Sequence, residues 1–492
     1  MTIASWIALI ASCGWLYWGL ILFYHGTYDD VYISQRYADN LAAGEGYAFN
    51  RGEAVEGASN PLWVFLIAAC RCFGMNGVFA AKVAGAACAL LLPVVAVALA
   101  VGMAPDSPPV IAGWLVGLSA PLAMWGVNGL ETPAYALAVT LGLMCGAADL
   151  TRLHGWPRAA PAFAAAAWLR PEGPLLAVPY LLAMAWRARH HRGARRATVQ
   201  AWGIVAGGVG LLVAWRFALF GVLLPNTYYA KLANPEIWPG GDGRQYVIRG
   251  LAGAGGVPLL CGMAAAFVMR GVVLSSVRLT AATVLCQICF IWWTGGDWMD
   301  GYRFWVPVLP ACLTLAAVGA GALWRTAAPS WGTGGRWLVA ACACWLTIVH
   351  AIQARDPLEE KLGGYTTALM QGHGRVAQWL RDRVSPGTLL AIADAGYVPW
   401  FTRLPTVDLL GLNDAFIARH PPRACADYVI ERRRPGVVVL AQRDHRGVWP
   451  LDRLIAARSD FERGWRQVTR VNFPAYDLVV YLRRDLSLLP RR

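Results

Sequence analysis

The chain of 492 residues is 57% hydrophobic and only 15% charged, well below the roughly 25% of charged residues found in soluble domains, which excludes an ordinary soluble globular protein. The formal net charge of +14 would suit nucleic acid, but the basic residues gather in short loops between apolar segments and in the C-terminal region. This distribution indicates a lipid bilayer as the partner, and no nucleic acid.

The first apolar segment covers about residues 4–24. It has no basic region before it and no clear small-residue cleavage site after it, which favours a retained transmembrane helix over a cleaved signal peptide. Further candidate spans, each long enough or nearly so to cross ~30 Å of hydrocarbon, are 77–102, 109–127, 131–149, 160–186, 200–220, 247–269, 275–294, 304–324 and 335–352.

Two segments decide the number of crossings. Residues 61–74 form a short apolar stretch that carries Arg71, and residues 160–186 are interrupted at "LRPEGP". Either 61–74 spans and 160–186 is one helix, or 61–74 does not span and 160–186 crosses twice. Both alternatives leave the basic segment "RARHHRGARR" on the cytoplasmic side. We favour the second, because it also places "TRLHGWPR" with its two arginines there and "RPEG" outside, in agreement with the positive-inside rule.

This choice gives about 11 transmembrane helices with the N-terminus inside. The segments rich in polar and aromatic residues then share the outer side: 25–60, 128–131, 170–173, 224–231 and 295–303. After about residue 354, short β-branched runs such as "PGVVVLAQ" alternate with amphipathic helical patterns, which predicts a small α/β domain. The predicted architecture is an all-α polytopic membrane core, residues 1–353, followed by a C-terminal α/β domain, residues 354–492.

The twelve cysteines lie mostly inside apolar segments, as in Cys286-x-x-Cys289. Small apolar packing explains them, so neither a zinc site nor a disulfide framework is expected. The motifs GxxxxGK[ST], HExxH and GxSxG do not occur in the sequence. The usual soluble nucleotide-binding, metalloprotease and serine-hydrolase signatures therefore give no support.

The first outer loop, residues 25–60, begins with two adjacent carboxylates, Asp29 and Asp30. Such a pair at a membrane exit is costly unless it is exposed, protonated or paired with a cation. The same loop carries several aromatic residues and further carboxylates such as Glu56. Carbohydrate sites have this makeup, whereas the alternative is a solvated loop.

Later outer segments add candidates for phosphate binding. "GGDWMDGYR" supplies Asp297 and Arg303, and the planar fork of arginine suits a phosphate. The same segment also fits an aromatic juxtamembrane anchor. Lys231, which follows Tyr228 and Tyr229, is a second phosphate candidate.

Three ionisable residues, Glu131, Arg170 and Glu172, are flanked by long apolar sequence. Residues of this kind usually pair with one another or line a polar cavity. A purely structural arginine–glutamate pair and a polar site both remain open from the sequence.

Six segments in order resemble one family, the C-type (GT-C) membrane glycosyltransferases, and within it the group of the mycobacterial terminal arabinofuranosyltransferase. More loosely, they resemble arabinosyltransferases that decorate pilins. The segments are "YDDVYISQRYADNLAAGEGYAFNRGEAVEGASNPLW", "NGLETPAYAL", "WLRPEGPLLA", "LPNTYYAKL", "GGDWMDGYRFWVPVLP" and "ADAGYVPWFTRLPTVDLLGLND".

The resemblance implies an enzyme of the bacterial inner (plasma) membrane. It would take a pentofuranose, D-arabinofuranose, from a polyprenyl-phosphate donor and transfer it to a hydroxyl of a glycan or glycoprotein acceptor on the extracytoplasmic side, where the C-terminal domain would also lie. The family places its catalytic base in the first outer loop, here at Asp29 or Asp30. The other aspartate would orient the base or hold a divalent cation, which leaves a metal at Asp30 open; no other cofactor is expected.

The leaving phosphate needs cations more than an acid, and Arg303, Lys231 and Arg36 are the candidates by topology. Polar and aromatic residues of the outer segments are predicted to bind the sugar or the acceptor: Tyr28, Glu56, Asn60, Glu131, Glu172, Asn226, Tyr228 and Asp297.

Two features depart from the family. The C-terminal domain is shorter than in the mycobacterial enzyme, and its α/β pattern does not resemble a β-sandwich sugar-binding module. One alternative is a related enzyme that uses another polyprenyl-phosphate sugar, such as mannose or aminoarabinose. A carrier of lipid-linked sugar would be expected to show repeat-like halves, which the sequence lacks, and the third alternative is a non-catalytic glycan-binding protein.

Overall fold

The computed structural model describes residues 2–104, 108–152, 155–232, 234–238, 240–268, 272–330, 332–350 and 355–490. The chain forms two compact units. Unit 1 consists of Met1–His25, Ala81–Leu212 and Gly241–Leu362, and unit 2 consists of Gly26–Ala80, Val213–Gly240 and Gly363–Arg492.

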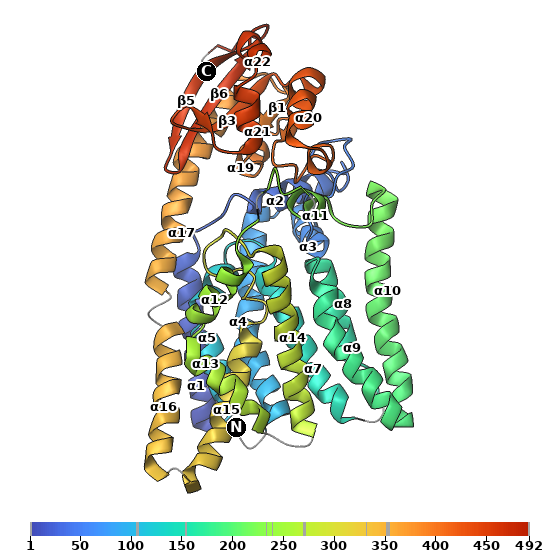
Figure 1. Ribbon diagram of the computed structural model, residues 1–492, viewed down its shortest axis with the longest axis vertical. Coiled ribbons are helices and arrows are strands. Elements are labelled where there is room, and N and C mark those ends of the chain that lie inside the picture. The colour runs from blue at the N-terminus through green and yellow to red at the C-terminus, as the bar shows by residue number, and fades with distance from the viewer. Residues whose placement is uncertain are drawn as a thin grey trace. The chain divides into compact units, whose positions relative to one another are not determined.

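Unit 1 is built from helices. They are α1 (Ile3–Phe23), α4 (Gly77–Met103), α5 (Val110–Gly117), α6 (Ala120–Gly126), α7 (Thr132–Thr151), α8 (Ala159–Leu169), α9 (Gly173–His190), α10 (Arg195–Phe220), α12 (Gly243–Gly253), α13 (Gly256–Ala265), α14 (Val272–Thr294), α15 (Leu309–Ser330), α16 (Gly332–Ile348) and α17 (Arg355–Leu369). Three of these helices, α4, α10 and α17, also contribute residues to unit 2. Helices α7, α8, α9 and α14 pack side by side, and α13 packs against α15 (Figure 1).

Several of these helices are long and apolar enough to cross a membrane. Among the described residues there are five: Ile3–Phe23, Gly77–Met103, Thr132–Thr151, Arg192–Phe220 and Leu274–Thr294, or six if the bent pair Gly243–Gly253 and Gly256–Ala265 is one span. Shorter apolar helices include Pro61–Cys72 and Ala159–Leu169. The chain is therefore a multi-pass membrane protein, and the predicted 11 crossings are not confirmed.

Three predicted spans differ from continuous helices. The span predicted at 109–127 is two helices, α5 and α6, because Ser119 caps the second with its side chain and Pro121 sits in that helix's first turn. The span predicted at 247–269 breaks between α12 and α13, which are bent by 84°. The interruption predicted at "LRPEGP" is present, since α8 ends at Leu169 and α9 begins at Gly173.

Unit 2 carries a mixed sheet of six strands in the order β2-β1-β3-β6-β5, with β4 paired to β3. Strands β1 (Leu390–Ile392), β2 (Thr406–Asp408) and β3 (Val437–Arg443) are parallel, whereas β4 (Arg446–Gly447), β5 (Trp465–Phe473) and β6 (Tyr476–Arg483) run antiparallel to their partners. This confirms the small C-terminal sheet with helices that the sequence predicted.

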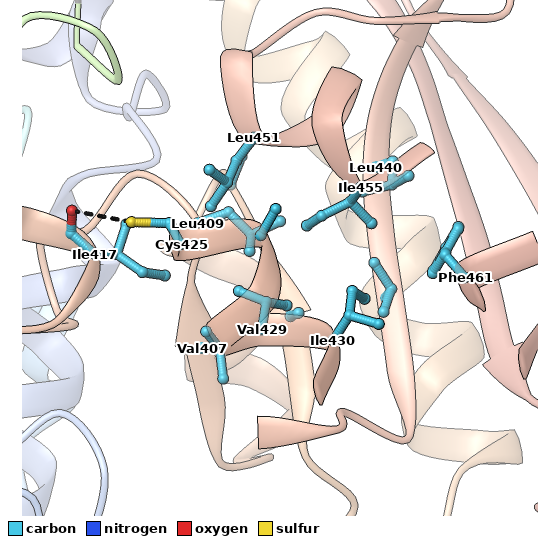
Figure 2. Packing of buried hydrophobic residues seen from close by; sticks show 14 of the residues in the cluster. Val407, Leu409, Ile417, Cys425, Val429, Ile430, Leu440, Leu451, Ile455 and Phe461 are labelled. Atoms are coloured by element: carbon cyan, nitrogen blue, oxygen red, sulfur yellow. Dashed lines mark hydrogen bonds between the residues drawn. The ribbon is translucent and has the colours of Figure 1, made fainter. Parts of the chain in front are cut away.

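Both faces of this sheet are covered. Side chains alternate along β3, so Val438 and Leu440 pack on one face while Val437 and Val439 pack on the other. The first face meets α20 (Pro422–Asp427), η6 (Tyr428–Arg433), α21 (Pro450–Ala456) and α22 (Ser459–Gly464) (Figure 2). The second meets α18 (Arg375–Arg383) and α19 (Tyr397–Thr402). Burial on both faces explains why β3 is an uninterrupted apolar run.

The rest of unit 2 comes from earlier parts of the chain. Helices α2 (Val31–Ala42) and α3 (Pro61–Cys72) pack together, and the short helix α11 (Asn226–Lys231) contacts η5 (Ile417–Arg419). A π-helical turn, η4 (Met370–Gly374), joins α17 to α18. Residues far apart in sequence therefore form one folded body.

Candidate active site

Asp29 precedes α2 and is held by the loop that follows strand β1. Its Oδ2 accepts a hydrogen bond from the backbone N–H of Gly396 at 2.9 Å, and its Oδ1 accepts one from the N–H of Tyr397 at 2.7 Å. The residue is buried, with 6% of its surface exposed. A carboxylate with one amide donor on each oxygen has a fixed orientation.

Gly396 is required by this close approach. A Cβ built on Gly396 would lie 2.2 Å from the backbone oxygen of Asp29 and 2.3 Å from its Oδ2. Real Cβ atoms essentially never come so close to other heavy atoms. Glycine is thus the residue that allows the loop to place two consecutive amides on one carboxylate.

Asp30 has a different environment from Asp29. It is the N-cap residue of α2, but its side chain makes no capping hydrogen bond. It is only half-buried. The two adjacent carboxylates are therefore distinct: Asp29 is anchored inside the protein and Asp30 is the more accessible of the two.

A second aspartate, Asp394, sits in the same loop as Gly396. Its Oδ2 is 3.0 Å from Nε2 of His373 and accepts a hydrogen bond from the hydroxyl of Tyr476 at 2.5 Å. His373 lies on the π-helical turn η4, a feature that is frequent at functional sites. The C-terminal segment thus brings an aspartate, a histidine and a tyrosine next to the predicted base.

Electrostatics set the proton affinity of Asp29. Burial raises its pKa to about 6, the charge of His373 lowers it, and the charges of Asp394 and Asp30 raise it again. Burial lowers the pKa of His373, but the hydrogen bond and charge of Asp394 and the charge of Asp29 outweigh it, so the net shift is upward. A carboxylate of this kind is ionised at neutral pH and still basic enough to take a proton.

Aromatic rings surround the two aspartates. Tyr28 packs against Tyr365 with ring centroids 4.8 Å apart, and Tyr32 packs edge-on against Tyr397 at 4.8 Å and beside Trp400 at 4.8 Å. Tyr28, a predicted sugar ligand, is fully buried. Its ring packs in the wall of this region, and its role as a sugar ligand stays a prediction.

Arg36, predicted to bind the donor phosphate, is bonded to protein groups on all sides. Its guanidinium donates to the carbonyls of Phe49 at 2.7 Å, Pro399 at 2.6 Å and Leu404 at 2.8 Å, and to the side chain of Asn50 at 3.1 Å. The residue is buried, with 4% exposed. The structure gives Arg36 the role of tying α2 to the C-terminal segment, and a phosphate would have to displace these bonds.

Glu56 and Asn226 are also engaged. Glu56 accepts from Nε of Arg216 with both oxygens, at 3.0 Å and 2.8 Å. Burial raises the pKa of Glu56 to about 7, and the charge of Arg216 and its hydrogen bonds oppose that shift. The Asn226 side-chain amide donates to the carbonyls of Gly411 and Leu412. Both residues hold unit 2 together.

Three further residues predicted to bind donor or acceptor belong to unit 2, namely Asn60, Lys231 and Tyr228. Asn60 is buried and lies 3.3 Å from the hydroxyl of Ser34. Lys231 is half-buried and lies over the ring of Trp238, 4.7 Å from its centroid. Tyr228 packs edge-on against Tyr229 at 5.5 Å.

Unit 1 contains a second polar cluster, an ionic network. Arg170 donates to Glu131 and Glu172, each at 2.8 Å, and Arg303 donates to Glu131 at 2.9 Å and approaches Asp297 at 3.4 Å. Two arginines thus face three carboxylates. The positive charge of Arg303 is compensated within the protein, so this cluster is arranged more like a site for neutral or positively charged polar groups than for a phosphate.

The sequence does not decide whether Asp30 binds a metal ion. Among the residues that the structure describes, no three or more histidine, cysteine, aspartate or glutamate side chains are grouped so that they could hold an ion. Both oxygens of Asp29 accept hydrogen bonds from backbone amides, which are donors and not metal ligands.

The sequence interpretation missed His373, Asp394 and Tyr476. They come from η4, the loop after β1 and strand β6, so no single motif contains them. One signal was available: Asp394 directly follows the apolar run of β1, where loops after parallel strands commonly carry functional side chains. Nothing in the local sequence marks His373 or Tyr476.

Part of the C-terminal segment matches a known domain family. Residues 364–485 match a family model described as "Domain of unknown function (DUF8728)". No curated protein matches the sequence.

Solved structures are similar over nearly the whole chain. ArnT from Cupriavidus metallidurans bound to undecaprenyl phosphate superposes with a TM-score of 0.59 at 14% identity, covering 98% of this chain and 98% of that chain. The Archaeoglobus fulgidus oligosaccharyltransferase tethered with an acceptor peptide gives 0.56 at 12% identity, covering 100% of this chain and 76% of that chain. At these identities the likeness concerns the fold alone, and it supports the GT-C fold that the motifs predicted.

Proposed function

We propose that the protein is an inverting glycosyltransferase that moves a pentofuranose, D-arabinofuranose, from a polyprenyl-phosphate donor to a hydroxyl of a glycan or glycoprotein acceptor. One observation carries this proposal: a buried carboxylate, Asp29, is held by two amides beside a second, half-buried aspartate at the start of α2. The solved structures of the same fold include one that binds undecaprenyl phosphate and one tethered to an acceptor peptide.

The reaction is a single displacement. Asp29 accepts the proton of the acceptor hydroxyl while that oxygen attacks the anomeric carbon. The bond from the anomeric carbon to the phosphate oxygen breaks, and its electron pair leaves with polyprenyl phosphate. We assign the base to Asp29 because its pKa, raised to about 6 by burial, lies closer to the working pH than that of an ordinary aspartate.

Asp30 supports the base in this scheme. Its charge raises the pKa of Asp29, and its more accessible position suits contact with the acceptor or the sugar. A general base typically contributes a factor of 10²–10⁴ to the rate. Loss of Asp30 should therefore cost less than loss of Asp29.

The leaving phosphate needs a cation. Of the three predicted candidates, Arg36 is bonded to four protein acceptors and Arg303 to two carboxylates. Lys231 is half-buried and is placed over Trp238. We therefore propose Lys231 as the donor phosphate ligand.

The predicted topology belongs to the same proposal. It comprises 11 crossings in the bacterial inner membrane, a catalytic core of residues 1–353, and an extracytoplasmic C-terminal domain, residues 354–492, with the first outer loop on the same side. Glu131, Glu172 and Asp297 are proposed to meet sugar or acceptor hydroxyls, which suits the excess of carboxylates in their network.

The proposal is tested by sugar transfer with purified protein in detergent. Polyprenyl-phosphoryl arabinofuranose, mannose and aminoarabinose are supplied in turn with candidate glycan acceptors, and Asp29→Asn and Asp30→Asn are assayed beside the wild type. Asp382→Asn is the matched control, since the side chain of Asp382 on α18 is 42% exposed and accepts a hydrogen bond from Gln378 on the same helix.

The proposal expects transfer of arabinofuranose by the wild type and the control, and loss of transfer in Asp29→Asn. Transfer of another sugar would keep the reaction and replace the donor. A donor that binds and is never consumed would favour the carrier or the glycan-binding alternative and overturn the proposal.

A further inference from the structure

The mechanism proposed above leaves a buried histidine unused. His373 is 1% exposed, and its Nε2 lies 3.0 Å from Oδ2 of Asp394. Its Nδ1 is buried and has no hydrogen-bond partner among the residues that the structure describes. A histidine held only for packing would not need a carboxylate partner, because burying a charged pair is costly.

The pair shares its support with Asp29. Asp394 and Gly396 belong to the same loop after β1, and this loop gives Asp29 its two amide donors. Tyr476 on β6 fixes Asp394 from a second direction. The ring of Phe473 packs edge-on against His373 at 5.0 Å and limits its movement. The positions of the histidine and of the anchored carboxylate are thus set by one rigid arrangement.

We propose that His373, held by Asp394 and Tyr476, is a positioning residue that keeps the carboxylate of Asp29 ionised and in place for proton abstraction. This inference rests on the proposed function of Asp29. His373 supplies positive charge in a region that otherwise holds three carboxylates, those of Asp29, Asp30 and Asp394. Without the charge of His373, burial and the neighbouring carboxylates would raise the pKa of Asp29 further and favour its protonated form.

Several titratable side chains face Asp29. They are Tyr32 on α2, Tyr365 on α17, Tyr397 on α19 and Tyr476 on β6, together with Asp30, Asp394 and His373. Burial raises the pKa of each of these tyrosines, so all four are neutral across the working pH range. Among these groups of the described structure, His373 is the one that becomes positively charged on protonation, and Asp394 raises its pKa.

The charge of His373 lowers the pKa of Asp29, so removing that charge raises it. The base must be ionised to act, and kcat/KM therefore falls as pH drops through the pKa of Asp29. A variant without the histidine charge should lose activity at a higher pH than the wild type.

The test is the pH dependence of kcat/KM for sugar transfer by the full-length protein, with the donor that the wild type uses. His373→Gln removes the charge while its side-chain amide can still donate to Asp394. Asp394→Asn is the second variant, because it withdraws the partner that keeps His373 protonated. His420→Gln is the control: His420 is exposed, stacks on Phe416 and bonds to the Phe416 carbonyl. Size-exclusion elution confirms that each variant is folded.

We expect the acidic limb of His373→Gln to move to higher pH by about one unit, with KM for the donor unchanged and the His420→Gln limb in the wild-type position. Asp394→Asn should move in the same direction by less, because it also removes a charge that raises the pKa of Asp29. Transfer with an unmoved limb in either folded variant would overturn this inference alone. Absence of transfer by the wild type at every pH would overturn the proposed function and this inference with it.

Discussion

Arg36 was predicted from the sequence to bind phosphate, but in the structure its guanidinium is hydrogen-bonded to protein groups. Its place in the first loop suggested a phosphate ligand, whereas its guanidinium meets three backbone carbonyls and one side-chain oxygen inside unit 2. The planar fork of arginine satisfies several acceptors at once, which the single ammonium of lysine cannot do.

Arg36→Lys should therefore lower stability and leave donor recognition intact. Leaving buried carbonyls without donors costs about 1–3 kcal/mol each, so we expect the melting temperature of the purified protein to fall by several degrees. The donor KM of the folded fraction should stay within about twofold. Arg381→Lys is the control, because Arg381 is exposed on α18, where it donates to Gln378, pairs with Asp382 and lies over the ring of Phe401 without meeting buried carbonyls. A raised donor KM at unchanged melting temperature would return Arg36 to the phosphate site.

At the scale of single residues, the sequence suggested part of the candidate site. Asp29 and Asp30 were predicted because the first outer loop combines carboxylates with aromatic residues, and because the family that the motifs resemble carries its catalytic base in that loop. The partners of Asp29 were not predicted, because Gly396, His373 and Tyr476 reach it from segments more than 340 residues away along the chain. Pairings of such separation depend on the tertiary fold and leave no local pattern.

Among the elements, the break between α12 and α13 has a clear backbone cause. Gly255 and Gly256 have φ values of +119° and +61°, which side-chain-bearing residues rarely adopt. A Cβ on Gly255 would also lie 2.2 Å from Cδ2 of Leu346. The two glycines thus allow the 84° bend.

Gly255→Ala should destabilise unit 1 by about 1–3 kcal/mol, through backbone strain and the clash with Leu346. Thermal unfolding in detergent measures this loss. Gly203→Ala serves as the control, since Gly203 lies inside α10 with open space around its Cβ position, and it should unfold at or slightly above the wild-type temperature. Equal melting temperatures for both variants would show that the bend does not depend on Gly255.

Sequence patterns predicted elements unevenly. The apolar run "PGVVVLAQ", which covers most of β3, was recognised because burial makes it continuous. Strand β5 was missed because polar side chains such as Arg466 and Gln467 interrupt its hydrophobic pattern. The span at 109–127 was predicted as one helix because a hydropathy pattern does not detect helix-capping residues. Ser119 separates α5 from α6 by accepting a hydrogen bond from the N–H of Leu122, which caps the second helix.

For the whole molecule, unit 2 combines chain segments that the sequence assigned to different parts. Asn50 exchanges hydrogen bonds with the backbone of Thr406, at 2.7 Å and 2.9 Å, and Asn226 bonds to Gly411 and Leu412. The predicted division near residue 354 stays a prediction. Removal of the C-terminal residues would nevertheless leave many buried polar groups of the first loop without partners.

A chain that ends at residue 362 should therefore aggregate or elute as a broad peak in size-exclusion chromatography, because buried Arg36, Asp29 and Asn226 lose their partners together. A chain that lacks only the last two residues is the control and should elute as the wild type does. A monodisperse truncated core that still binds polyprenyl-phosphoryl arabinofuranose would contradict this view of unit 2.

The most direct test of the central claim is the single-turnover rate of arabinofuranose transfer by Asp29→Asn relative to the wild type, with Asp382→Asn measured alongside. If Asp29 is the general base, the rate of Asp29→Asn should be lower than that of the wild type by a factor of about 10²–10⁴. Donor binding should be retained, and Asp382→Asn should react at the wild-type rate. Transfer by folded Asp29→Asn within a few-fold of the wild type would contradict the assignment of Asp29 as the base.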